Sequence, residues 1–215
     1  QRRLKKGGYF TDYSILGRSP LFWGIPAGDF GVLLEHLKAE TRSYKKGDLI
    51  CHAGEHTNAL GIVLTGSVTI ESDDIFGNRS VLDKVGPGQV FAETYACVPN
   101  EPMLVNVAAA ENCTVLFLKT AQILSPCAVN CRHHGKLIEN LLLVSAQKNL
   151  SLSRRIFHTA PKTIRGRLIS YLSFQAIREN SDSFTIPFNR QQLADYLGVD
   201  RSALSKEMGK MRDEG

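Results

Sequence analysis

The sequence predicts an α+β protein with an N-terminal antiparallel β domain, a long helix and a C-terminal helical domain. Three observations support this prediction. Short apolar runs separated by glycines occupy residues 41–119, apolar residues recur at helical spacing over residues 132–158, and two short helices flank Gly198. The period of the hydrophobic pattern therefore changes twice along the chain, and each change marks an expected boundary.

These changes divide the chain into four expected segments. Residues 1–18 form a basic tail, residues 19–120 form the β domain, residues 121–158 hold a linker and the long helix, and residues 159–215 form the C-terminal domain. Pro161 marks the expected hinge before the last domain, because proline interrupts a helix.

Composition limits the possible classes of protein. The 215 residues are 43% hydrophobic and 22% charged with a formal net charge of +5, as in a soluble globular chain, and this charge is compatible with a nucleic-acid partner. No apolar run approaches the ~18 residues of a membrane span, and no signal peptide opens the sequence. The five cysteines form no compact secreted framework. We therefore expect a cytoplasmic protein without a membrane partner.

The β domain is expected to begin with short helices near residues 20–22 and 30–38. Its strands include residues 62–64, 68–70 and 115–118, which are separated by glycine turns. A series of short antiparallel strands of this kind favours a closed or double-layered structure, such as a double-stranded β-helix or jelly roll.

The long helix carries a heptad pattern with alternating spacings of four and three. The seam of this pattern consists of Ile138, Leu142, Ser145, Asn149, Leu152 and Ile156. Polar residues in such a seam can fix the register of two helices, so we predict that this helix pairs with its own copy in a homodimer. The alternative is a long core helix inside one domain.

The C-terminal residues predict two helices joined by a tight turn. Asn189 can cap the first helix with Gln192 in the capping-box position, and Gly198 can end it. Asp200 can cap the second helix. Residues 183–188 are expected to form a strand before the first helix, which gives a winged-helix order whose wing hairpin would begin where the sequence stops.

The second of these helices is amphipathic. Leu204, Met208 and Met211 recur at i, i+4 and i+7, so we expect them to face the core. The opposite face and the start of the first helix offer cations, hydroxyls and amides, which suit phosphates and base edges. The predicted DNA-binding residues are Arg201, Ser202, Ser205, Lys206, Asn189, Arg190 and Gln191. The alternative is an ordinary helical hairpin with a solvated polar face.

Three further stretches precede this helix-turn-helix in a fixed order. They are residues 44–55 (YKKGDLICHAGE), residues 61–68 (GIVLTGSV) and residues 86–93 (GPGQVFAE). Together with residues 189–215, they resemble the Crp/Fnr superfamily of bacterial transcription regulators. The resemblance implies a cyclic-nucleotide-binding-like β-roll that senses a small-molecule effector, and a homodimer paired along the following helix. It also implies a pseudo-palindromic operator of double-stranded DNA and RNA polymerase as a partner.

The resemblance places the family's base-reading positions on Arg201, Ser202 and Lys206. Arg201 matches the family's pattern, whereas Ser202 stands where glutamate is frequent and Lys206 where arginine is frequent. Serine and lysine discriminate bases less sharply than glutamate and arginine do. We therefore expect an operator that differs from those of the best-known members.

The effector site departs further from the family. Its cyclic-nucleotide binders use a Gly-Glu pair for the ribose and an Arg-Ser or Arg-Thr pair for the phosphate, but this chain has Ala92-Glu93 and Met103-Leu104. Methionine and leucine offer no cation or donor to offset the desolvation of a phosphate. We therefore expect an unknown effector rather than cyclic AMP. The expected pocket residues are Ala92, Glu93, Thr94, Met103, Leu104 and Leu141. The alternative is an interior filled by the protein's own side chains.

The cysteines suggest a second kind of input. Cys127 and Cys131 are four residues apart and are followed by His133 and His134, so they are weak candidates for a metal or redox site. Structural cysteines are the favoured interpretation, because free cysteine often behaves as a small buried hydrophobe. We assign no metal and no cofactor.

The sequence contains no Ser/His/Asp order, P-loop or HExxH motif, so we do not expect an enzyme. The competing interpretation is a signalling module whose β-roll regulates a partner protein without binding DNA. Residues 189–215 favour the regulator, because such a module does not need them.

Overall fold

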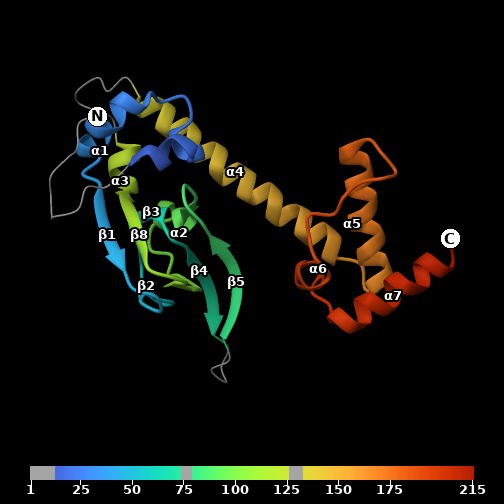
Figure 1. Ribbon diagram of the computed structural model, residues 1–215. Coiled ribbons are helices and arrows are strands. Elements are labelled where there is room, and N and C mark those ends of the chain that lie inside the picture. The colour runs from blue at the N-terminus through green and yellow to red at the C-terminus, as the bar shows by residue number, and fades with distance from the viewer. Residues whose placement is uncertain (1–12, 74–78, 126–132) are drawn as a thin grey trace. The chain divides into compact units, whose positions relative to one another are not determined.

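The computed structural model describes residues 13–73, 79–125 and 133–215. The chain forms two compact units that divide between Ser145 and Ala146, inside helix α4 (Figure 1). The first unit combines two β-sheets with short helices, and the second is helical in its described elements. This composition confirms the predicted α+β class.

The β structure consists of two four-stranded antiparallel sheets. One sheet has the order β1 (Glu40–Tyr44), β8 (Cys113–Lys119), β3 (Ala59–Thr65) and β6 (Val90–Phe91). The other has the order β2 (Leu49–Cys51), β7 (Asn106–Ala109), β4 (Val68–Asp73) and β5 (Arg79–Val85). The chain passes repeatedly between the two sheets, as the predicted double-layered β structure requires.

The central strands β3 and β8 are buried on both faces. Val63 and Val115 point into the interior between the sheets, where they pack with Phe91. Ile62 and Leu116 belong to a second cluster, which packs against the helices. Burial on both faces explains why these strands are continuous apolar runs in the sequence rather than alternating ones.

Short helices and the first part of α4 (His134–Thr159) contribute to this second cluster. The helical elements before α4 are η1 (Tyr13–Arg18), η2 (Pro20–Phe22), η3 (Ala27–Asp29), α1 (Phe30–His36), α2 (Glu93–Cys97) and α3 (Thr120–Leu124). Leu137, Leu141 and Val144 anchor α4 there. The first part of α4 is therefore a core helix of the first unit.

The folded part of the first unit includes the last residues of the predicted basic tail. Tyr13–Arg18 form η1, and Leu16 is fully buried in the core of the first unit. Burying one leucine contributes roughly 1.5–3 kcal/mol, which is enough to fix a short turn of this kind. Residues 13–18 therefore belong to the folded unit, while residues 1–12 lie outside the described residues.

The second unit contains α5 (Ile164–Glu179), α6 (Arg190–Leu197), α7 (Arg201–Asp213) and the last turns of α4. Its core consists of Leu168, Tyr171, Leu193, Ala194, Leu197 and Leu204. The strand expected over residues 183–188 is absent. Pro187 has no N–H to donate to a ladder, and no other strand occurs among residues 133–215. Ile186 and Phe188 instead pack against the helical core.

Candidate nucleic-acid interface and effector region

The turn between α6 and α7 forms as the sequence predicts. The side chain of Asn189 accepts a hydrogen bond from the backbone N–H of Gln192 at 2.9 Å, and the Gln192 side chain accepts one from the Asn189 N–H at 2.9 Å. Gly198 ends α6 in the left-handed conformation at φ +63°. Asp200 caps α7 by accepting from the backbone N–H of Ala203 at 2.9 Å.

The two faces of α7 differ in exposure. Leu204 is fully buried, and Met208 and Met211 pack against the same core, as their spacing predicts. The opposite face carries the exposed Arg201, Ser202 and Lys206 and the half-buried Ser205. The side chains that face the core hold α7 in place, so its first turns present a polar surface to the solvent.

Some predicted DNA-binding residues already have partners within the protein. The Ser202 hydroxyl donates to Asp200 Oδ1 at 2.5 Å, and Gln191 Nε2 donates to Asp195 Oδ1 at 2.8 Å. The Ser202 hydroxyl and the Ala203 N–H hold the pKa of Asp200 below its ordinary value, so this cap is a carboxylate. Among the described residues, Arg201 and Lys206 form no ion pair.

Two carboxylates of the α7 region are neutralised from α5. Arg165 Nε donates to Glu207 Oε1 at 2.8 Å, and Arg165 Nη2 donates to Glu214 Oε2 at 2.7 Å. These pairs reduce the negative charge that would otherwise repel a phosphate backbone. Among the described residues, the exposed start of α7 therefore carries cations without an ion-pair partner, and the acidic residues of its later turns are paired.

The predicted dimer seam on α4 is exposed within the single chain. Leu142, Leu152 and Ile156 keep 70%, 63% and 68% of their surface in solvent. Ile138 is 36% exposed, whereas its neighbour Leu137 is fully buried in the first unit. Ser145 is half-buried and Asn149 is exposed. The apolar residues of the seam therefore leave a large apolar surface in solvent.

The predicted effector residues lie in different environments. Met103 is buried between the sheets with Phe91, while Leu141 belongs to the separate cluster around the helices. Leu104 is 71% exposed and Thr94 is also exposed. Met103 and Leu104 are adjacent, yet one side chain is buried and the other is exposed. The exposed position of Leu104 differs from the prediction, which placed this residue in the effector pocket beside Met103.

The adjoining pair Ala92-Glu93 lies at the start of α2. Ala92 adopts φ +58°, a left-handed conformation that disfavours a side chain, and Glu93 is buried. The Thr94 hydroxyl donates to Glu93 Oε1 at 3.4 Å. The Glu93 carboxylate therefore lies in a buried position at the start of α2.

Side chains fill the space between the sheets. Nine buried residues form this cluster: Val63, Val68, Val85, Phe91, Met103, Val107, Ala109, Cys113 and Val115. The Phe91 ring packs so closely on Gly61 that a Cβ at that position would lie 2.2 Å from a ring carbon. A surface pocket of about 470 Å³ is lined by residues 56–58, Ala96 and residues 98–101.

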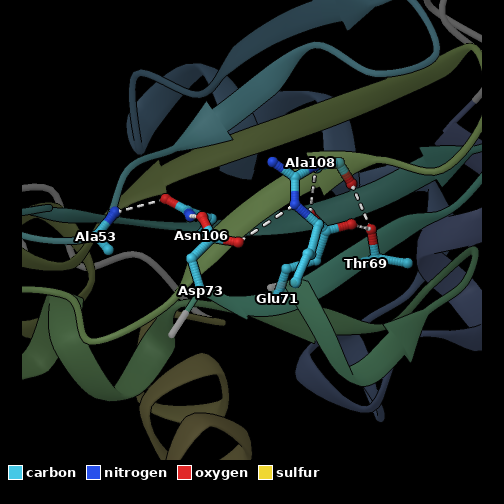
Figure 2. A network of polar contacts seen from close by, with 7 residues as sticks. Ala53, Thr69, Glu71, Asp73, Asn106 and Ala108 are labelled. Atoms are coloured by element: carbon cyan, nitrogen blue, oxygen red, sulfur yellow. Dashed lines mark hydrogen bonds and ion pairs between the residues drawn. The ribbon is translucent and has the colours of Figure 1, made fainter. Parts of the chain in front are cut away.

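A polar network that sequence reasoning missed lies on the β4-β5-β7 sheet. Figure 2 shows Asp73, Asn106 and Glu71 side by side, with Asn106 Nδ2 donating to Asp73 Oδ2 at 2.9 Å. Arg79 lies 3.2 Å from Glu71 and 3.3 Å from Asp73. The alternation of polar residues in β4 could have indicated a polar face of the sheet. It could not have identified the partners of these residues, which lie on other strands. The network joins three strands on one face of the sheet.

Burial governs the chemistry of the described cysteines. Desolvation raises the pKa of the Cys51 thiol to about 11, and it raises the pKa values of Cys97 and Cys113 as well. A raised pKa keeps these thiols protonated and poorly nucleophilic. Cys127 and Cys131 lie outside the described residues, and His133 contacts Asp29 at 2.7 Å.

His134, the last of the four weak metal candidates, is buried. No group of three or more metal-binding side chains occurs in the described part of the chain. Helices long and apolar enough to cross a bilayer are likewise absent from the described residues.

Both units match known protein families. The family model of the cyclic nucleotide-binding domain matches residues 41–130, and that of the Crp-like helix-turn-helix domain matches residues 166–215. The chain is 24% identical over 182 residues to the cAMP-activated global transcriptional regulator CRP of Haemophilus influenzae, covering 80% of this chain and 76% of that protein.

A second relative shares the first unit. The chain is 27% identical over 129 residues to a cyclic nucleotide-gated potassium channel of Mesorhizobium japonicum, which covers 59% of this chain and spans 33% of the channel. Among solved structures, the catabolite activator protein of Thermus thermophilus has the same fold, with a TM-score of 0.54 and 22% identity over 92% of this chain and 88% of that one. With both family models matched in order along the chain, the protein belongs to the Crp/Fnr superfamily of DNA-binding transcription regulators.

Proposed function

We propose that this protein is a homodimeric regulator that reads a pseudo-palindromic operator with the first turns of α7. The observation that carries the proposal is the exposed start of α7, where Arg201 and Lys206 have no ion-pair partner among the described residues while Leu204 is buried beneath them. A helix-turn-helix presents its base-reading residues at this position, and cations there suit phosphates and guanine edges.

The exposed seam of α4 supports the dimer. Leu142, Leu152 and Ile156 would each remove a large apolar surface from water on pairing with a second copy. A two-fold dimer presents two α7 helices, and these fit half-sites about one helical turn of DNA apart. RNA polymerase remains an expected partner.

The input to the β-roll is proposed to be something other than cyclic AMP bound in the usual way. Met103 occupies one of the positions where the family's nucleotide binders place their phosphate-binding pair, and its side chain packs in the interior. A buried phosphate without a cation or donor would be strongly unfavourable. Isothermal titration of the full chain with cyclic AMP is expected to give no saturable heat, and micromolar binding would overturn this part of the proposal.

The DNA-binding proposal is tested by selecting duplexes from a random library and measuring affinity by fluorescence anisotropy over a range of salt. We expect an enriched two-fold symmetric motif. We also expect log K to fall with log salt, by about 0.9 per phosphate contacted. Selection without a motif, together with salt-independent binding, would favour the signalling module instead.

A further inference from the structure

The C-terminal end of α6 is held by two arginines from different parts of the second unit. Arg155 donates to the carbonyls of Asp195 at 3.0 Å and Tyr196 at 3.1 Å. Arg167 Nη1 donates to the carbonyls of Leu197 at 2.9 Å and Gly198 at 3.0 Å. Four consecutive carbonyls of the helix-turn-helix therefore accept hydrogen bonds from guanidinium groups.

These carbonyls are suited to cations. The last four carbonyls of a helix lack partners within the helix, and the macrodipole places a partial negative charge there. A guanidinium group presents donors in a planar fork, so one arginine can bind two neighbouring oxygens. The two side chains thus fix the residues that lead directly into the recognition helix α7.

The two arginines connect this turn to the end of α4. Arg155 lies on α4 itself, and Arg167 Nε also donates to the carbonyl of Pro161 at 2.9 Å, in the connection between α4 and α5. Thr163 caps α5 by accepting from the N–H of Gly166 at 3.0 Å. The expected hinge at Pro161 is therefore hydrogen-bonded to Arg167 and is followed directly by the capped start of α5.

Aromatic packing strengthens the same connection. His158, near the end of α4, is 2% exposed, and its ring centroid lies 5.6 Å from Tyr171, 5.2 Å from Phe174 and 6.1 Å from Tyr196. Its Nδ1 lies 3.2 Å from the Ser170 hydroxyl. The last turn of α4 is thus packed against α5 and α6 within the second unit.

We propose that Arg155 and Arg167 are positioning residues that fix the direction of α7 relative to the end of α4. The inference rests on the proposed function, since α4 carries the proposed dimer seam and α7 the DNA-reading face. In such a dimer, the orientation of α7 relative to α4 sets the distance between the two recognition helices. The arginine contacts therefore determine which half-site spacing the regulator accepts.

The test compares wild type with Arg155→Lys, Arg167→Lys and the double variant, all as the full chain. Lysine keeps the charge but lacks the fork that binds two carbonyls. Arg178→Lys is the matched control, because Arg178 is exposed on α5 and pairs with the adjacent Glu179. Affinity is measured for the selected operator and for the same operator with one base pair added between the half-sites.

Wild type and the control are expected to prefer the original spacing. In the double variant this preference should fall by about tenfold. A less firmly held α7 is expected to lose the equivalent of one good base contact at the original spacing. Non-specific affinity and its salt dependence should stay unchanged, because the charge is kept. A preserved spacing preference would overturn the proposal. A loss of spacing preference that occurs only in variants with a lower unfolding midpoint would overturn it as well. Arg155→Lys separates the two effects, because Arg155 is exposed and its replacement should leave the unfolding midpoint unchanged.

Hydrogen exchange separates this inference from the proposed function. The amides of Gly198 and Val199 donate to carbonyls of α6 at 3.3 and 3.0 Å. They should exchange faster in the double variant than in wild type or Arg178→Lys, without any DNA present. Unchanged exchange would refute the arginine contacts as a constraint on the turn, whereas failure to select an operator would refute the DNA-binding proposal alone.

Discussion

The recognition helix and the effector β-roll respond differently to departures from the family's pattern. On α7, Ser202 and Lys206 replace common family residues at exposed positions, so the helix keeps its place and only the recognised surface changes. Between the sheets, Met103 replaces a polar residue at a buried position, and its side chain becomes part of the core. A substitution on an exposed face changes the surface that the helix offers to a partner, whereas one in a buried cluster changes the packing of the core.

The largest expected effect concerns the packing of side chains around Met103 in the interior of the β-roll. Met103→Ala should lower the free energy of unfolding of the first unit by about 2–5 kcal/mol, because it leaves a cavity in a packed cluster. Urea unfolding measures this cost. Leu104→Ala is the matched control and should change stability by less than about 0.5 kcal/mol, since Leu104 is 71% exposed. Equal costs for the two variants would mean that the interior is not packed around Met103.

The α4 seam offers a second test, because it separates a surface that needs a partner from one that does not. Leu142→Glu should dissociate the dimer in sedimentation velocity, since each buried leucine is worth roughly 1.5–3 kcal/mol. Val32→Glu places the same charge on an apolar residue of α1 that is similarly exposed, at 71%. This control should leave the dimer intact, and a dimer that survives Leu142→Glu would argue against the seam.

Two glycine-to-alanine substitutions in the helix-turn-helix should change the free energy of unfolding by smaller amounts and in opposite directions. Gly198→Ala should destabilise the second unit by about 1–2 kcal/mol, because an alanine there must adopt a left-handed conformation. The Cβ itself would meet only ordinary contacts, with Arg167 Nη1 at 3.8 Å. Gly209→Ala, in the middle of α7 with open space around its Cβ, should stabilise by up to about 1 kcal/mol. Thermal unfolding that gives both variants the same sign would contradict this account.

The smallest effect concerns pH. Burial, aided by the cation of Arg154, lowers the pKa of His158 below its ordinary value of 6.5. Tyr171 and Tyr196 also face the ring, and both stay neutral in this range because burial raises their pKa values. The unfolded chain then binds the proton first, so stability contributed by neutral His158 falls as pH drops below about 6.5. Urea unfolding at several pH values should show a shallower acid loss in His158→Phe than in wild type, and identical profiles would exclude this contribution.

Local interactions explain why the helix-turn-helix could be predicted residue by residue. Asn189, Gly198 and Asp200 act within a few positions of themselves, so capping and turn rules identify them from sequence alone. The two sheets were also predictable, because glycine turns separate apolar runs. The surroundings of the expected pocket residues could not be predicted in this way, because Met103 and Leu141 lie in separate clusters formed by distant segments.

Long-range hydrogen bonds were missed for the same reason. Arg155 and Arg167 bind carbonyls about 30 to 40 positions away in the sequence, and no local pattern predicts such partners. The strand expected over residues 183–188 failed because a strand depends on a neighbour that sequence periodicity does not supply.

The most direct test of the DNA-reading face is a competition gel shift with wild type and Arg201→Ala on a selected operator. Arg201→Ala is expected to lose about 1–3 kcal/mol of specific binding and to keep most of its affinity for unrelated duplex. Unchanged specific affinity would contradict the claim that the start of α7 reads DNA.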